Sequence, residues 1–255
     1  MLLNTFRAEF TKLRTTRSFW WTSGIFLVFA WGWAALVAAF TSAGLEGISS
    51  INVAVVPVGV QYLGFAVLMI QAIMVVTTEY RYGMQSVTLM SNPNRFMVAA
   101  CKLLLYGFIA ALLTLVGVAG AFLIADWMAK GVVAEMFDPF NDDIGRRLLW
   151  TFPVGAAALV MFAQGLGLLL RQTAGAVSVG LIFFLGIDQF ILFLPKIGEK
   201  LVHYSPFRGM GNWITDYAPG DAPWGDSVTA YGAVFLAWAL VLWVGGLINL
   251  MARDA

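Results

Sequence analysis

The chain has 255 residues, of which 60% are hydrophobic and only 11% are charged. Soluble proteins carry about 25% charged residues. A water-soluble fold of this size could not cover its surface with so few charges, so lipid must solvate much of the chain. The net charge of +1 gives no basic field of the kind that binds nucleic acid.

Motifs for catalysis and for metal or nucleotide binding are missing from the sequence. Cys101 and His203 are the only cysteine and histidine, so no intrachain disulfide and no zinc framework can form. The patterns H-E-x-x-H, G-x-S-x-G and G-x-x-x-x-G-K-[ST] do not occur. We therefore expect that the chain is not an enzyme, binds no metal or cofactor itself, and depends on a partner for any use of ATP.

Six apolar stretches are long enough to cross about 30 Å of hydrocarbon as helices of roughly 20 residues. They lie at about 19–40, 53–77, 103–125, 149–170, 174–194 and 228–250. The runs are continuous and do not alternate, which favours helices over a β-barrel. The first is too long for a cleaved signal peptide. We predict an all-α membrane protein in which residues 1–255 form a single transmembrane domain with six spans.

The positions of Lys and Arg predict the orientation in the membrane. Four basic residues closely precede the first span: Arg7, Lys12, Arg14 and Arg17. They place the N-terminus in the cytoplasm, and six spans return the C-terminus to the same side. Segment 78–98 then becomes a cytoplasmic loop, and segments 126–148 and 195–227 become extracytoplasmic loops.

Residues 1–18 have the spacing of an amphipathic helix. Apolar residues recur at intervals of three and four from Leu3 to Leu13, on one helical face. A helix in the cytoplasmic headgroup layer suits this pattern. A basic tail with accidental periodicity is the alternative. The candidate residues of the interfacial helix are Phe6, Glu9, Phe10, Lys12 and Leu13.

The cytoplasmic loop 78–98 mixes polar and apolar groups too closely for a slack linker. Gly83 permits a sharp change of direction. A short helix from about Met84 to Met90 would follow, and Pro93 would end it. Such a helix would offer a soluble partner a rigid, partly apolar surface. On composition alone, a plain connecting loop fits equally well.

This loop resembles the one between the second and third spans in permease subunits of the type-2 ATP-binding-cassette (ABC) exporter family. The shared pattern is Glu-Tyr, a basic residue, a nearby Gly, a Thr/Leu-containing helix, and then Pro and Arg. Here the pattern consists of Glu79, Tyr80, Arg81, Gly83, Thr88, Leu89, Pro93 and Arg95. Segment 9–14 resembles the family's amphipathic N-terminal helix, and segment 203–206 resembles its Tyr-x-Pro outer segment. Met84 stands where the family usually has Thr.

The resemblance implies a coupling helix that docks on a separate ABC ATPase subunit, present in two copies, which binds the ATP and magnesium. The implied coupling residues are Glu79, Tyr80, Arg81, Gly83, Met84, Val87, Thr88, Leu89, Pro93 and Arg95. It also implies a second permease copy, in a homodimer or close heterodimer, in a bacterial cytoplasmic membrane. The expected function is export of an amphipathic or hydrophobic compound: a drug or antibiotic, as in multidrug resistance, or a lipid or a peptide.

Candidate residues of the translocation path are Gln61, Phe65, Met69, Asp188 and Gln189. An acid within a span costs about 2.5–3.5 kcal/mol on insertion scales. Asp188 therefore either attracts cationic cargo or is a hydrated structural acid near the outer surface. Phe65 and Met69 present an adaptable apolar surface or simply pack.

Glutamines and glycines within the spans have a further interpretation. Gln61, Gln71 and Gln164 either line a path or form hydrogen bonds between helices. Gly165 and Gly167 are expected to allow close helix approach.

Two other classes of function deserve comparison. A non-transporting membrane scaffold or sensor associated with an ATPase would have the same spans and the same loop. An intramembrane enzyme would need paired acids, a Ser–His pair or a metal cluster at one depth. Only Asp188 lies within a predicted span, and His203 lies outside one, which disfavours the enzyme.

Overall fold

The computed structural model describes residues 2–42, 51–91, 94–130, 134 and 136–252. Within these ranges the regular elements are all helical. Five helices are long and apolar enough to cross a membrane. An all-helical fold is one of the few that a bilayer tolerates, because a helix satisfies its own backbone hydrogen bonds where no water is present.

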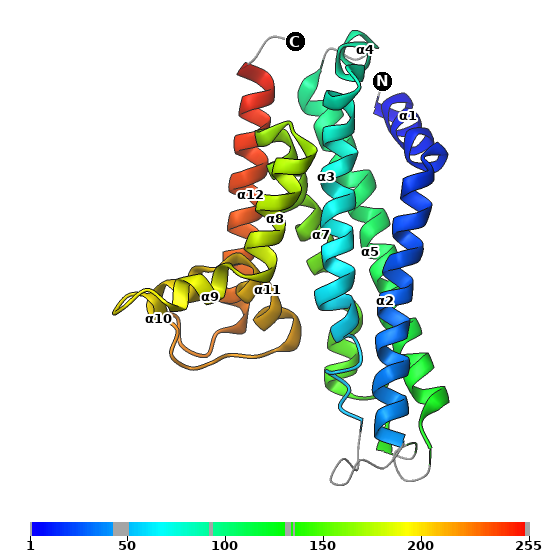
Figure 1. Cartoon of the computed structure of the whole chain (residues 1–255), viewed down its shortest axis with the longest axis vertical. Helices are drawn as coiled ribbons and strands as arrows, with labels where there is room; N and C mark the ends of the chain where they lie inside the picture. The colour runs from blue at the N-terminus through cyan, green and yellow to red at the C-terminus, as the bar shows by residue number, and fades with distance from the viewer. Residues whose placement is uncertain (1, 43–50, 92–93, 131–133, 135, 253–255) are drawn as a thin grey trace.

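The helices follow one another along a chain that runs back and forth between two ends of the molecule (Figure 1). In order they are α1 (Leu2–Thr15), α2 (Arg17–Ser42), the π-helical turn η1 (Val60–Gly64), α3 (Phe65–Arg81), α4 (Met84–Ser91), α5 (Arg95–Met128), α7 (Asp143–Leu170), α8 (Thr173–Leu185), α9 (Ile187–Leu192), α10 (Gly198–Leu201), the 3-10 turn η2 (Val202–Tyr204), α11 (Pro206–Thr215) and α12 (Val228–Ala252). Both termini, α1 and α4 lie at one end, and α9 and α10 project sideways from the bundle (Figure 1).

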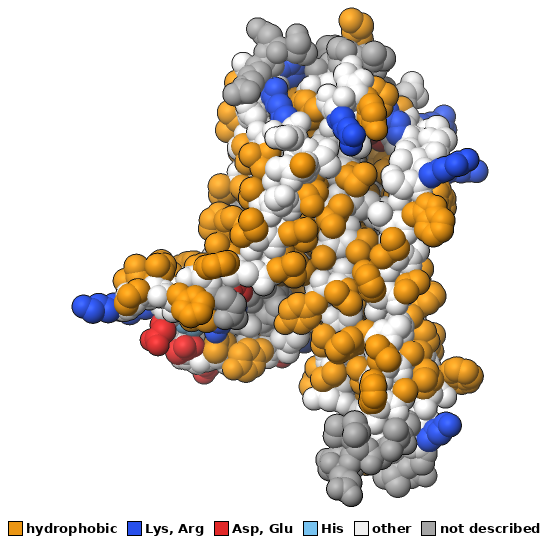
Figure 2. Space-filling model, in the orientation of Figure 1, with side chains coloured by type: hydrophobic (Ala, Val, Ile, Leu, Met, Phe, Trp, Pro, Cys, Tyr) orange, Lys and Arg blue, Asp and Glu red, His pale blue; other side chains and the backbone are white. Residues whose placement is uncertain are grey.

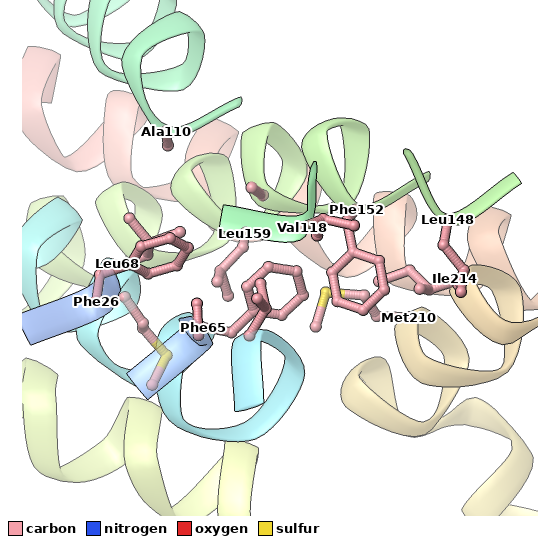
Figure 3. Packing of buried hydrophobic residues seen from close by; sticks show 14 of the residues in the cluster. Phe26, Phe65, Leu68, Ala110, Val118, Leu148, Phe152, Leu159, Met210 and Ile214 are labelled. Atoms are coloured by element: carbon pink, nitrogen blue, oxygen red, sulfur yellow. The ribbon is translucent and has the colours of Figure 1, made fainter. Parts of the chain in front are cut away.

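Helix α7 is the centre of the packing, because it contacts α3, α5 and α12. The core contains Phe26 of α2, Phe65 of α3, and Phe152 and Leu159 of α7, which are at most 1% exposed. The rings of Phe65 and Phe152 lie 5.7 Å apart between centroids. Figure 3 shows these side chains converging with residues of α5 and α11 in one continuous cluster.

Large apolar side chains also cover the outside of the bundle. Figure 2 shows them along the shaft, with Lys and Arg side chains near the end that carries α1 and α4. Trp21, Leu104 and Phe108 are each more than two-thirds exposed. A continuous apolar surface of this kind is stable against hydrocarbon and not against water. The shaft is therefore the membrane-embedded part of a multi-pass protein.

The fifth predicted span, 174–194, is not one continuous helix. Helix α8 ends at Leu185, Gly186 follows, and α9 begins at Ile187. The 13 residues of α8 extend about 20 Å, short of the hydrocarbon thickness. Glycine is a poor helix former, and in α9 the Asp188 carboxylate accepts a hydrogen bond from Ser205 Oγ. After α8 the chain therefore leaves the direction of the bundle, and α9 projects to the side (Figure 1).

Four of the other predicted spans, 19–40, 103–125, 149–170 and 228–250, lie within observed helices. Helices α5 and α7 extend beyond 103–125 and 149–170 into segments that were expected to be loops. The helix of the second span begins several residues after 53 and contains the π-helical turn η1. The predicted outer loop 195–227 contains α10, η2 and α11.

The helices α7 and α12 touch through their backbones at two glycines. A Cβ atom on Gly165 would lie 2.6 Å from the carbonyl carbon of Leu242 and from the amide nitrogen of Trp243. A Cβ on Gly246 would lie 2.9 Å from the carbonyl oxygen of Gly165. The expected close approach at Gly165 is confirmed. At Gly167 the nearest atom would lie at an ordinary 3.4 Å, so that residue has room for a side chain.

We predict that Gly165→Leu destabilises the protein by about 1–3 kcal/mol, because the added atoms meet backbone that cannot turn aside. Gly24→Leu is the matched control, since Gly24 has nothing within 4 Å of its Cβ position. The thermal unfolding midpoint in detergent should fall for the first variant only. Equal midpoints for both variants would contradict the tight crossing.

Candidate functional site

Four charged side chains from three helices meet at the end of the bundle that carries α1 and α4. Lys102 Nζ of α5 lies 2.5 Å from Glu9 Oε2 of α1 and 2.8 Å from Glu79 Oε1 of α3. Lys12 Nζ of α1 lies 2.8 Å from Glu9 Oε1 and 2.7 Å from Glu79 Oε1. The two ammonium and two carboxylate groups make this charge cluster neutral, and it joins α1, α3 and α5.

Three members of the charge cluster are buried and one reaches solvent. The exposed fraction of the side chain is 5% for Glu9, 9% for Glu79 and 6% for Lys102, against 40% for Lys12. Charges buried this deeply are stable only when they are paired. Each of the three buried groups has two partners of opposite charge within the cluster. The cluster therefore holds α1 against α3 and α5.

The pKa values of the two α1 members reflect this pairing. Burial acts to raise the pKa of Glu9, but the attraction of Lys102 and Lys12 outweighs it and holds the pKa below its usual value. Burial acts to lower the pKa of Lys12, but the hydrogen bonds to Glu79 and Glu9 hold it above its usual value. Both side chains are therefore charged at neutral pH.

Helix α4 joins the charge cluster through one further bond. Lys12 Nζ donates to Thr88 Oγ1 at 3.3 Å. Gly83 has φ +65° between α3 and α4, a conformation that glycine adopts without strain, so α4 can turn back beside α3. A short helix was predicted from about Met84 to Met90, and the structure has one over Met84–Ser91.

A second set of contacts connects this end of the bundle to the last turn of α12. Arg95 Nη1 donates to the carbonyl oxygen of Leu250 at 2.8 Å. Arg171 Nη2 donates to that of Asn249 at 2.7 Å, and its guanidinium lies 5.3 Å from the ring centroid of Tyr80. Cations that bind the free carbonyl groups at a helix C-terminus stabilise it. Tyr80 and Arg95 therefore hold helices together in this structure.

The remaining predicted coupling residues lie at the surface or outside the described residues. Arg81 is exposed, and Met84 is 45% exposed at the start of α4. Nothing is described of the side chains of Val87 and Leu89, and Pro93 lies outside the described residues. Met90 is 84% exposed, so α4 presents methionines at both of its ends.

A cavity of about 410 Å³ lies toward the other end of the molecule, between η1, α9 and α11. It brings together Gln61 of η1 and Asp188 of α9, which are far apart in the sequence. Phe65 and Met69, also predicted for the path, are fully buried in the core. The Gln189 side chain lies outside the described residues. We call this space, with Gln61, Asp188, Arg208 and Asn212 on its wall, the outer cavity.

Two of the glutamines within the spans form hydrogen bonds between helices. Tyr106 Oη of α5 donates to Gln71 Oε1 of α3 at 2.6 Å, and Gln71 Nε2 donates to the carbonyl oxygen of Phe19 at 3.1 Å. Gln164 Nε2 donates to the carbonyl oxygen of Lys102 at 3.3 Å. These two side chains fit the packing interpretation. Gln61 borders the outer cavity.

Sequence reasoning missed three residues of these sites: Lys102, Arg208 and Asn212. Lys102 stands at the edge of the apolar run 103–125, and a basic residue beside a span suggested only orientation. A basic residue at the start of one span, after a span that ends near Glu79, was the signal for a pair. Arg208 lies in a segment predicted to be a loop, where a basic residue carries no specific signal. Among the described residues, no group of three His, Cys, Asp or Glu side chains could hold a metal ion.

We predict that Lys102→Gln destabilises the protein by about 3–5 kcal/mol, because it leaves two buried carboxylates with only Lys12 to neutralise them. Lys130→Gln, at an exposed position, is the control. Adding Glu9→Gln to Lys102→Gln should recover much of the loss, since it removes one unpaired charge. The measurement is the unfolding midpoint in detergent. If the destabilisation of the double variant equalled the sum of the effects of the two single substitutions, direct pairing would be contradicted.

The packing of α1 should depend on pH in a defined direction. Glu9, with its lowered pKa, stabilises the folded state above its unfolded pKa, and this contribution is lost as pH falls through the folded pKa. Lys12, with its raised pKa, stabilises below its unfolded pKa, and this is lost as pH rises through the folded pKa. Hydrogen exchange of α1, corrected for the intrinsic rate, should thus be constant over roughly pH 5 to 8. Loosening of α1 within that window would contradict the pairing.

Comparison with known proteins agrees with this arrangement. A family model described as "ABC-2 family transporter protein" matches residues 5–189. The match includes α1, the charge cluster, α4 and Asp188, and it covers most of the chain. A comparison with curated proteins finds no match. The membrane subunits of the matched family are in general not catalytic and typically work with an ATPase partner. The chain belongs to the ABC-2 family of transporter proteins, which confirms the predicted family.

Proposed function

We propose that this chain is the permease subunit of an ABC exporter that moves an amphipathic or hydrophobic compound out of the cell. Hydrolysis of ATP, bound with magnesium on a separate ATPase subunit, would drive the movement. The observation that carries the proposal is that α3 with η1 connects the two sites. Glu79 at one end belongs to the charge cluster beside α4, and Gln61 at the other borders the outer cavity.

Helix α4 supplies the docking surface for the ATPase in this proposal. Its exposed methionines, Met84 and Met90, are flexible and polarizable, and they adapt to a partner's groove. Arg81 adds an exposed positive charge beside them. Because Thr88 of α4 bonds Lys12, and Lys12 bonds Glu79, a displacement of α4 would reach α1 and α3 together.

The membrane placement of the proposal puts α1, α4 and both termini in the cytoplasm. Phe6 and Phe10 are 40% and 47% exposed on α1, while Glu9 is turned into the bundle. A helix that exposes aromatic residues together with basic ones, as Arg7 and Arg14 are here, suits the cytoplasmic headgroup layer. The bacterial cytoplasmic membrane is the expected location. Two permease copies, identical or closely related, would pair with two ATPase copies.

The docking role of α4 predicts that Met84→Asp/Met90→Asp strongly reduces binding of the ATPase subunit while the fold is retained. A charge on an exposed side chain costs little stability, but it has no partner in an apolar groove. Met136→Asp is the control, because Met136 is similarly exposed at the opposite end of the chain's long helices. The measurements are co-purification of the co-expressed ATPase and ATP-driven uptake of a fluorescent amphipathic dye into inside-out vesicles, in which export appears as accumulation in the lumen. ATPase binding without export of any cargo would favour a scaffold or sensor over a transporter.

The membrane placement predicts the result of cysteine labelling in intact cells. Tyr82, between α3 and α4, and Asp226, before α12, are both exposed, and the chain's own Cys101 is buried. An impermeant maleimide should label Asp226→Cys from outside, and Tyr82→Cys only after the membrane is permeabilised. Labelling of Tyr82→Cys from outside would reverse the orientation and remove α4 as an ATPase contact.

A further inference from the structure

The outer cavity contains a guanidinium group, that of Arg208, for which the described part of the chain supplies no hydrogen-bond or ion-pair partner. Arg208 of α11 lines the cavity, and it forms no ion pair or hydrogen bond with a described residue. Its Nε–H is inaccessible to solvent and is not bonded. A guanidinium offers five N–H donors in a fixed planar geometry, and a partly buried one is costly to leave unpaired. Arg208 is therefore suited to receive an anionic group.

Asn212, one turn further along α11, adds a second donor beside the same cavity. Its Nδ2 atom is buried, and its side chain interacts with the hydroxyl of Tyr231. An amide nitrogen carries two N–H donors, so one of them is left for the cavity. Residues four apart on a helix lie on one face, so the donors of Arg208 and Asn212 share a side of α11. Buried donors without partners are uncommon in folded proteins. Their joint presence at a cavity wall indicates that something else accepts their hydrogen bonds.

A negative charge borders the same space. Asp188 of α9 accepts a hydrogen bond from Ser205 Oγ, and a carboxylate can accept several more. Arg208 acts on Asp188 electrostatically, and no ion pair within 4.0 Å joins these two described residues. Two opposite charges that face one cavity without pairing leave space for a ligand that carries both signs. The nearby rings of Phe184 and Phe207 supply an apolar wall.

We propose that the outer cavity binds a zwitterionic head group. Its phosphate or carboxylate would lie at Arg208 and Asn212, and its amine at Asp188, with the apolar portion along Phe184 and Phe207. The volume of about 410 Å³ falls within the range of ligand pockets. The identification of this head group as part of the cargo rests on the proposed function. The binding itself requires neither ATP nor an ATPase subunit.

The test measures head-group preference directly. The full chain, purified in dodecyl maltoside, is titrated with lysophosphatidylethanolamine (zwitterionic), lysophosphatidylglycerol (anionic) and sphingosine (cationic), and bound molecules are counted by native mass spectrometry. Each charged hydrogen bond contributes about 1.5–3 kcal/mol, so the zwitterion should bind roughly tenfold tighter than either single charge. Equal affinity for the three head groups would overturn the inference.

Single variants should shift the preference in opposite directions. Arg208→Gln should lose roughly tenfold for the zwitterion and should come to prefer the cation, whereas Asp188→Asn should come to prefer the anion. Arg208→Lys keeps the charge and should keep the preference for the zwitterion. Arg146→Gln and Asp143→Asn are the controls, because these two residues form an exposed ion pair away from the cavity. Unchanged preference in Arg208→Gln and Asp188→Asn, both eluting as a single species, would overturn the assignment.

The same probes separate this inference from the proposed function. ATP-driven movement of labelled lysophosphatidylethanolamine from the liposome leaflet that faces the ATPase to the opposite leaflet would identify the head group as that of cargo. Binding without movement would identify a resident lipid and would leave the site in place. Active export of other amphipathic compounds with no head-group preference at the cavity would support the exporter and overturn the inference.

Discussion

The position of the N-terminal helix depends on the buried charge cluster of Glu9, Lys12, Glu79 and Lys102. A single unpaired charge at this depth would cost several kcal/mol, so α1 cannot leave the bundle without exposing Lys102 and Glu79 to an apolar environment. Helix α1 contributes one charge of each sign, and it gives Lys102 and Glu79 a second partner each in addition to the bond between them. Ion pairing therefore joins the helices at this end of the molecule, as apolar packing around Phe65 and Phe152 joins them at its centre.

Much of the fold follows from solvent chemistry and could be predicted. Runs of apolar residues without charge can only be helices in a bilayer, and five long helices occupy the predicted places. The interruption at Gly186 was not predictable from hydropathy, because Ile187, Phe190 and their neighbours are as apolar as a true span. It depends on a contact between Asp188 and Ser205, and such a long-range hydrogen bond leaves no local pattern in the sequence.

The sites were predictable in part, for a related reason. Glu79 could be found through the family resemblance of the loop, and Gly83 because glycine permits a sharp change of direction. Gln61 and Asp188 could be found because polar groups in apolar runs need partners. Which candidate residues line the same cavity depends on how the helices pack. Gln61 and Phe65 were both candidates for the path, but Gln61 lines the cavity and Phe65 is fully buried in the core. Arg208 stands out only when its lack of a partner is seen in three dimensions.

The connection between the two ends of the molecule depends on one helix and on its least regular turn. From Gln61 to Glu79 the chain runs through η1 and α3, a distance of about 27 Å at 1.5 Å per residue. An α-helix transmits a displacement along its axis with little compression, so a shift of Glu79 would arrive at η1. There the backbone is π-helical, a rare geometry that occurs mostly at functional sites and that can exchange with α-helical hydrogen bonding. Such an exchange would rotate Gln61 relative to Asp188 and change the shape of the outer cavity. The irregular turn thus lies where a movement begun at α4 would have its effect on cargo.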